Sequence, residues 1–93
     1  MDPIQIPIED VLDLHHFRPK EIPSLLEEYF SACRQKGIFT VRIIHGKGHG
    51  ILKKRVLAFL EKSPIVSSYH AAPAQAGGWG ATIVELKSSK GKR

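Results

Sequence analysis

Cysteine is almost absent from this sequence, because Cys33 is its single cysteine in 93 residues. One thiol can form no disulfide within the chain and cannot supply a cysteine-based zinc site, so both of these small-domain scaffolds are excluded. Long apolar runs are absent too. The longest stretch without a charged residue, residues 63–84, is interrupted by two prolines and three glycines and cannot form a membrane-spanning helix. The first residues contain no basic segment followed by an apolar core, so we expect no signal peptide, no membrane contact and a cytoplasmic location.

The composition is that of a folded domain. Apolar residues make up 42% and charged residues 25%, close to the average of globular proteins, which excludes a wholly disordered chain. A chain of this length builds one hydrophobic core and not two. We divide it into an N-terminal extension (residues 1–10), one domain (residues 11–87) and a basic C-terminal tail (residues 88–93).

The two halves of the chain carry opposite net charges. Residues 1–40 contain seven acidic and four basic side chains, a net charge of −3, whereas residues 41–93 contain two acidic and ten basic ones, a net charge of +8. A basic half favours a phosphate-rich partner such as nucleic acid, because lysine and arginine replace the counterions of the phosphates. Four of the ten bases lie in the last seven residues, so a solvated tail explains part of the excess.

Hydrophobic periodicity predicts strands and helices in the order β-α-β-α-β-β. Apolar residues recur at helical spacing between Ile22 and Cys33 and again between Leu52 and Leu60, whereas the other apolar runs are short. The first three strands are joined by helices and should run parallel, and the fourth should run antiparallel to the third. The predicted fold class is therefore α/β: a two-layer sandwich of a four-stranded mixed sheet and two helices. The expected strands are residues 11–15, 39–44, 65–70 and 81–87, with a loop at residues 71–80.

The unusual residues gather where the predicted strands end. His15 and His16 follow the first strand, residues 45–50 follow the second, and His70 ends the third. An antiparallel fourth strand begins at that same edge and brings residues 77–80 to it. Ligands of open α/β sheets bind at the carboxyl ends of the parallel strands. We therefore expect a functional site on this edge, which we call the rim.

A glycine-rich loop, His45-Gly-Lys-Gly-His-Gly50, joins the second strand to the second helix. Such a loop places free backbone N–H groups at a helix N-terminus, where an anion is stabilised, and its glycines allow close approach. It lacks the Walker A pattern of ATP-binding loops. The loop is either a phosphate-binding site or a tight turn without a ligand. The residues expected to contact phosphate are Gly46, Lys47, Gly48, His49 and Gly50.

Asp13, His15 and His45 are the candidate catalytic residues. Histidine transfers protons near neutral pH, so His15 and His45 could act as general acid and base. Asp13 precedes His15 by two residues and would share its strand face. There it could orient the imidazole, bind a metal ion or serve as a structural carboxylate. RNA suits a histidine pair because its 2′-hydroxyl needs only deprotonation, whereas DNA needs an activated water. We therefore expect RNA cleavage to survive chelation and DNA nicking to need one divalent cation, Mg²⁺ or Mn²⁺, at Asp13.

Aromatic and basic side chains extend the expected interface along the rim. Trp79 lies between glycines and either stacks on a base or covers the edge of the core. Lys53 and Lys54 on the second helix either extend the phosphate-binding track or form a solvated helix face. The nucleic-acid contacts expected in these two segments are Gly77, Gly78, Trp79, Gly80, Lys53 and Lys54.

Three of these segments resemble the signatures of the Smr (small MutS-related) domain family. The resemblance spans residues 12 to about 86, in the family's order and spacing. It implies a two-layer α/β sandwich, nucleic-acid binding and, in many members, endonuclease activity on DNA or RNA. One position departs from the pattern, because the family usually has glycine after the first motif histidine and here this residue is His16. The three segments are Leu12-Asp-Leu-His15, Ile44-His-Gly-Lys-Gly48 and Gly77-Gly-Trp-Gly-Ala-Thr82 with Val84.

We therefore expect a stand-alone Smr-like domain that binds nucleic acid and has endonuclease activity. The resemblance also implies the ribosome as a candidate partner, since some members act on stalled ribosomes. Two alternatives stay open: a nucleic-acid- or ribosome-binding module without cleavage, and a binder of phosphorylated metabolites that uses the same loop. Salt separates the two kinds of ligand, because affinity for a long polyanion falls steeply with salt.

Overall fold

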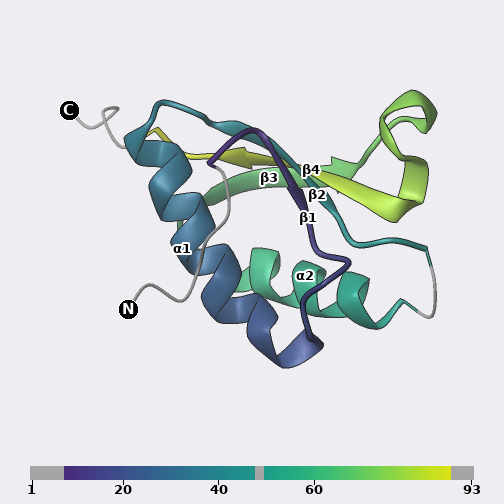
Figure 1. Ribbon diagram of the computed structural model, residues 1–93. Coiled ribbons are helices and arrows are strands. Elements are labelled where there is room, and N and C mark those ends of the chain that lie inside the picture. The colour runs from purple at the N-terminus through teal and green to yellow at the C-terminus, as the bar shows by residue number, and fades with distance from the viewer. Residues whose placement is uncertain (1–7, 48–49, 89–93) are drawn as a thin grey trace.

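The computed structural model describes residues 8–47 and 50–88. Its strands and α-helices follow the predicted order β-α-β-α-β-β (Figure 1). Most of the predicted extension and tail, together with Gly48 and His49 of the glycine-rich loop, lies outside the described residues. The elements are β1 (Val11–Asp13), α1 (Ile22–Gln35), β2 (Thr40–Ile44), α2 (Ile51–Lys62), β3 (Val66–Ala71) and β4 (Ala81–Leu86).

The four strands form one sheet in the order β1-β2-β4-β3. β1 and β2 are parallel, and β4 runs antiparallel to both β2 and β3. The first three strands thus point the same way, as expected from their connections, and the last strand is inserted between the second and the third. The predicted fold class, a two-layer α/β sandwich with a mixed sheet, is confirmed.

Both α-helices pack on the same face of the sheet (Figure 1). Phe30 of α1 is fully buried, and its ring lies 5.9 Å from that of Tyr29 and 6.1 Å from that of Phe59 on α2, measured between centroids. These rings join the two helices beneath the strands. The buried core cluster consists of Leu12, Leu14, Ile22, Leu25, Leu26, Tyr29, Phe30, Cys33, Val41, Ile43, Val56, Leu60, Val84 and Leu86.

Two prolines determine how the first helix begins. Pro19 opens a short 3-10 turn, η1 (Pro19–Glu21), and α1 follows directly from Ile22. Pro23 then stands in the first turn of α1, where a backbone N–H would have no partner within the helix, so it removes no hydrogen bond. Within the described part of the chain, no helix has both the length and the apolarity that crossing a lipid bilayer requires.

Candidate nucleic-acid interface

β1 is shorter than predicted because Asp13 ends it. The strand stops at Asp13, and the backbone N–H of His15 donates to Asp13 Oδ1 over 2.9 Å. Aspartate side chains often accept a bond from the backbone N–H two residues later, and this bond turns the chain away from the strand. Leu14 stays beside β2, because its N–H donates to Ile44 O at 2.9 Å and its side chain is buried. The expectation that a regular strand runs to His15 is therefore wrong, although the two side chains still meet.

The imidazole of His15 is oriented by the same carboxylate. His15 Nδ1 lies 2.6 Å from Asp13 Oδ1, and the two side chains are 57% and 55% exposed. When Nδ1 donates this bond, the neutral ring carries its free lone pair on Nε2. The pKa of Asp13 is held below its ordinary value mainly by the hydrogen bond from the backbone N–H of His15. Partial desolvation raises this pKa, and the imidazole of His15 lowers it further. The result is an ionised carboxylate beside an accessible histidine.

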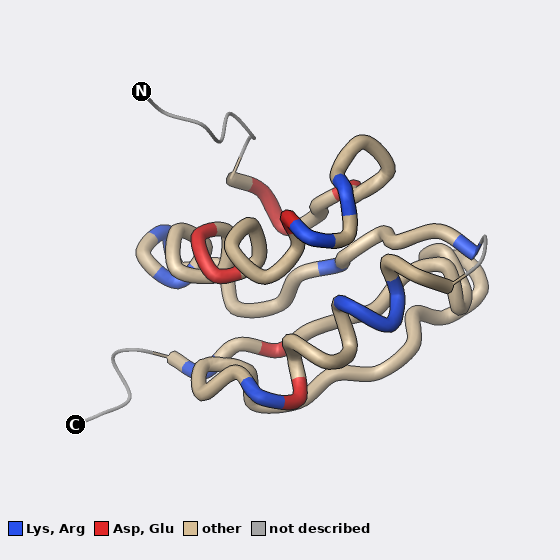
Figure 2. The backbone as a smooth tube through the Cα atoms, turned by 90° about the horizontal axis from the view of Figure 1, so that it is seen from below, with Lys and Arg blue, Asp and Glu red and all other residues tan. Residues whose placement is uncertain are grey.

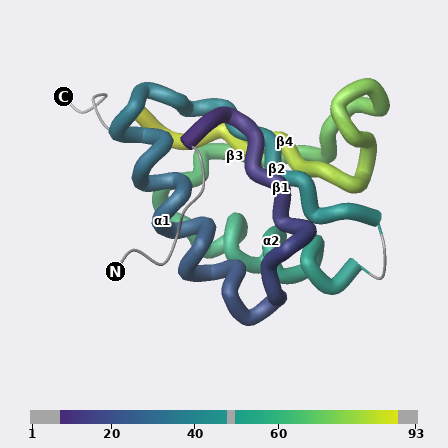
Figure 3. The backbone as a smooth tube through the Cα atoms, in the orientation of Figure 1, coloured from purple at the N-terminus to yellow at the C-terminus, as the bar shows by residue number. Residues whose placement is uncertain are grey.

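The glycine-rich loop approaches His15 from the end of β2. Gly46 has a φ of +80°, and a Cβ at this position would lie 3.4 Å from His15 Nε2. The backbone N–H groups of His45 and Gly46 both donate to Gly80 O, at 3.0 and 2.9 Å. These bonds tie the loop to the segment that precedes β4, so three regions far apart in the sequence meet here. Figure 3 shows the β2–α2 connection and residues 72–80 at the same end of the sheet.

Lys47 lies directly across Gly80. A Cβ at Gly80 would stand 3.0 Å from Lys47 Cγ and 3.5 Å from Lys47 Cε, a tight contact at the first atom. Glycine at position 80 therefore lets the stem of Lys47 pass close over the backbone without shifting. Arg42 of β2 holds the same segment from the other side, because its Nη1 donates to Ala76 O at 2.9 Å.

Trp79 is the most exposed large apolar side chain of the described residues, with 63% of its surface accessible. It belongs to a 3-10 turn, η3 (Gly78–Gly80). Lys53 of α2 reaches this turn, and its Nζ lies 5.0 Å from the centre of the indole ring, which is a cation–π distance. The sequence analysis expected Trp79 either to stack on a base or to cover the edge of the core. The exposure of its side chain excludes burial against the core.

His45 is placed very differently from His15. Its side chain is only 5% exposed, with Nε2 lying 2.8 Å from Thr82 Oγ1 and Nδ1 lying 3.2 Å from Gly46 O. Burial is the main cause that lowers the pKa of His45, and the ammonium of Lys53 acts in the same direction. Both ring nitrogens thus face protein atoms, and the ring is not open to a substrate.

Basic residues are frequent in the sequence between the end of β2 and the first turns of α2. Figure 2 shows their blue backbone positions toward the same end of the molecule. Gly50 precedes α2 with a φ of +78° and supplies no side-chain cap to the first N–H groups of the helix. Of the predicted phosphate contacts, Gly46 and Lys47 lie beside Gly80 and Gly50 begins the turn into α2, whereas Gly48 and His49 lie outside the described residues.

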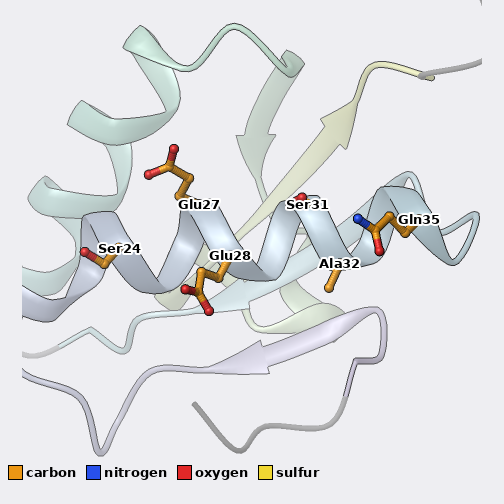
Figure 4. A pocket seen from close by; sticks show the side chains of 6 residues that line it. All are labelled: Ser24, Glu27, Glu28, Ser31, Ala32 and Gln35. Carbon is orange, nitrogen blue, oxygen red and sulfur yellow. The ribbon is translucent and has the colours of Figure 1, made fainter. Parts of the chain in front are cut away.

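Two hollows of the surface differ in the charge of the residues that line them. A hollow of about 520 Å³ runs along α1 and is lined by Glu27 and Glu28 with four neutral residues (Figure 4). Its carboxylates would repel a phosphate. His70, predicted on the rim, lines a hollow of about 230 Å³ together with Lys53 and Thr82, which contact Trp79 and His45. Among residues 8–47 and 50–88, no three His, Cys, Asp or Glu side chains are grouped as metal ligands would be.

The family model of the Smr domain matches residues 12–87. The chain belongs to the Smr domain family. Endonuclease MutS2 of Leuconostoc mesenteroides is 45% identical to it over 80 residues, which cover 86% of this chain. MutS2 of Halothermothrix orenii is 40% identical over 81 residues, 87% of this chain. In both cases the chain spans only 10% of the relative's length.

Solved Smr structures show the same fold. The Smr domain of Thermus thermophilus MutS2 superimposes with a TM-score of 0.80 at 30% identity, covering 85% of this chain and 99% of that domain. YdaL, a stand-alone small MutS-related protein from Escherichia coli, gives a TM-score of 0.79 at 27% identity, covering 88% of this chain and 67% of YdaL. The predicted family is therefore confirmed.

Two contacts near the Smr motifs were missed by the sequence analysis. Thr82 was part of the third motif without a role, and it proves to be the partner of the His45 ring. Arg42 received no role either, although it carries the bond that holds residues 72–80. Strand alternation offers a signal for Arg42, because it shares the face of β2 opposite the buried Val41 and Ile43.

The buried His45 of this Smr domain predicts a loss of stability in mild acid. Its pKa is lowered on folding from an ordinary value of 6.5, so the unfolded chain binds the proton more readily. The contribution is complete above about pH 6.5 and is lost as the pH falls through the folded-state pKa. We expect the Tm to stay level from pH 7.5 to about pH 6.5 and to fall between about pH 6.5 and pH 5, below the ordinary pKa of histidine. His45→Gln should flatten this dependence, and His70→Gln, on the exposed part of β3, should keep it. Parallel Tm curves for wild type and His45→Gln would contradict this prediction.

Proposed function

We propose that this Smr domain binds nucleic acid along the rim and is an endonuclease that cleaves RNA there, with His15 as its general base. The observation that carries the proposal is the accessible Asp13–His15 pair, whose free Nε2 lies against the backbone of Gly46 beside Lys47. Endonuclease is also the activity in the name of the MutS2 relatives. Their similarity supports a nuclease at the level of the family.

The chemistry follows from the free lone pair of His15. In RNA, Nε2 would take the proton of a 2′-hydroxyl, whose oxygen then attacks the adjacent phosphorus. The bond from phosphorus to the 5′-oxygen breaks, and this oxygen takes a proton from solvent. Lys47 and the uncapped N-terminus of α2 would stabilise the charge that develops on the phosphate. The products are a 2′,3′-cyclic phosphate and a 5′-hydroxyl.

We propose a positioning role for His45 in place of the predicted proton transfer. Its ring links Thr82 of β4 to the carbonyl of Gly46, and so it fixes the glycine-rich loop relative to the sheet. A buried ring with two protein partners suits this task better than proton exchange with a substrate. The pair of histidines expected from the sequence is thereby reduced to His15, assisted by Asp13.

A metal ion has little support as a partner of these residues. Within residues 8–47 and 50–88, Asp13 belongs to no group of three potential metal ligands, and its Oδ1 already accepts two bonds from His15. These donors therefore do not fit a protein-bound divalent cation. That DNA nicking needs Mg²⁺ or Mn²⁺ stays a prediction from the sequence, as do a ribosomal partner and a cytoplasmic location.

The test is cleavage of end-labelled RNA and DNA by the pure protein, with and without a chelator. We expect RNA fragments in both conditions, and mass spectrometry should find 2′,3′-cyclic phosphate ends. Fragments with 5′-phosphate and 3′-hydroxyl ends, formed only with metal, would show that water is the nucleophile and that His15 is not the base. Salt-sensitive binding without cleavage would leave the alternative of a binding module. A ligand affinity that hardly changes with salt would indicate a small phosphorylated metabolite.

A further inference from the structure

The two faces of the Trp79 indole are not equivalent. The ammonium of Lys53 lies over the ring, 5.0 Å from its centre, yet 63% of the side chain remains accessible. The ring therefore has a cation over it while most of its surface stays accessible. An exposed tryptophan of this kind is unusual, because a ring of this size is normally placed against the core.

The turn that carries Trp79 is held by backbone hydrogen bonds. Gly78 N donates to Pro73 O at 2.9 Å, and Gly80 N donates to Gly77 O at 3.1 Å. Gly80 O in turn accepts the two N–H groups from the end of β2. Since the turn is fixed at both ends, little conformational entropy is lost when a flat ligand stacks on the ring.

The surroundings of the ring indicate the chemistry of its ligand. The ammonium of Lys53 lies over the indole, and the stem of Lys47 passes the adjacent Gly80, so two lysines lie at the turn that carries the ring. An apolar segment of a partner protein would have to cover both charges. A nucleotide offers an aromatic base for the ring and phosphates for the lysines, the combination that single-strand binding proteins use.

We propose that Trp79 and Lys53 form a binding site for one unpaired base, so that the substrate is single-stranded or locally unpaired nucleic acid. This inference rests on the proposed function and names its substrate class. In a continuous duplex both faces of every base are covered by its neighbours, and Trp79 could not stack without extruding a base. The Gly80–Gly46 contacts connect this site to His15, so an unpaired base on the indole would bring the neighbouring phosphate toward Nε2.

Trp79 is the only tryptophan of the chain, so intrinsic fluorescence reports on this site alone. Three ligands with equal numbers of phosphates separate stacking from charge: a single-stranded oligodeoxynucleotide, a blunt DNA hairpin whose loop consists of abasic sites, and a single strand composed of abasic sites. All are deoxy and are used with a chelator, so cleavage does not interfere. We expect the base-containing single strand to quench the emission and the other two to leave it nearly unchanged.

Affinities measured by fluorescence anisotropy of labelled ligands provide the second readout. Trp79→Ala should weaken binding of the base-containing single strand by about 5- to 150-fold, corresponding to ~1–3 kcal/mol per stacked base, and should hardly affect the abasic strand. Trp79→Phe should recover part of the loss. Gln35→Ala is the control, because Gln35 is an exposed residue at the end of α1 that lines the acidic hollow, and it should bind as wild type.

Two outcomes would overturn the inference in different ways. Wild-type protein that binds none of the three ligands would remove the proposed function together with the inference. Wild-type protein that binds all three equally, with no change on Trp79→Ala, would leave the nucleic-acid interface intact and exclude base stacking. The exposed indole would then belong to a contact with another partner. A Tm of Trp79→Ala close to that of wild type is expected from its exposure.

Discussion

Replacement of His15 by glutamine is expected to lower the rate of RNA cleavage by about 10²- to 10⁴-fold, the usual effect of losing a general base. The side chain is 57% exposed and makes no core contact, so the Tm and the affinity for RNA should stay close to those of wild type. Single-turnover cleavage with saturating protein separates the chemical step from binding. This is the largest functional effect that the structure predicts.

His16 supplies the matched control for this measurement. It is the adjacent residue, is equally a histidine and is exposed, but the structure gives it no bond to Asp13. His16→Gln should therefore cleave at nearly the wild-type rate, and Asp13→Asn should fall between the two, because its amide oxygen can still accept but carries no charge. Equal losses in His15→Gln and His16→Gln would contradict the assignment of His15.

Replacement of Phe30 by alanine is expected to lower the free energy of unfolding by about 3–5 kcal/mol. Phe30 is fully buried, and its ring contacts both Tyr29 and Phe59, so the truncation leaves a cavity where the two helices meet. The free energy of unfolding of a native domain is only about 5–15 kcal/mol, so this single change removes a large part of the stability. Urea denaturation followed by circular dichroism measures it.

Ser31→Ala, at the next and exposed position of α1, is the control and should change stability by less than about 0.5 kcal/mol. Because the rim is carried by strands that rest on this core, cleavage by Phe30→Ala should persist at low temperature and disappear as the variant unfolds. A loss of activity while the variant is still folded would mean that the core also controls the geometry of the rim. A decrease in stability below about 1 kcal/mol would contradict the predicted packing.

Local patterns in the sequence determined most of the fold. The apolar stripe of α1 that includes Leu26 and Phe30 has the 3.6-residue period of a helix, and all of its predicted members are buried. The short β-branched run of β2 was likewise predicted within one residue of its observed start. Such elements depend on residues two to four positions apart, so the sequence alone specifies them. The three motifs gave the family for the same reason, because each is a contiguous segment.

Contacts between distant segments were decided only by the tertiary structure. β4 pairs with both β2 and β3, and the sequence does not specify this insertion because strand order depends on pairings over tens of residues. The same insertion places Thr82 beside His45, which converts an expected catalytic histidine into a buried one. It also carries Trp79 to Lys53. Burial and side-chain partners are properties of packed layers, and so the chemical role of each motif residue became visible only when the sheet was assembled.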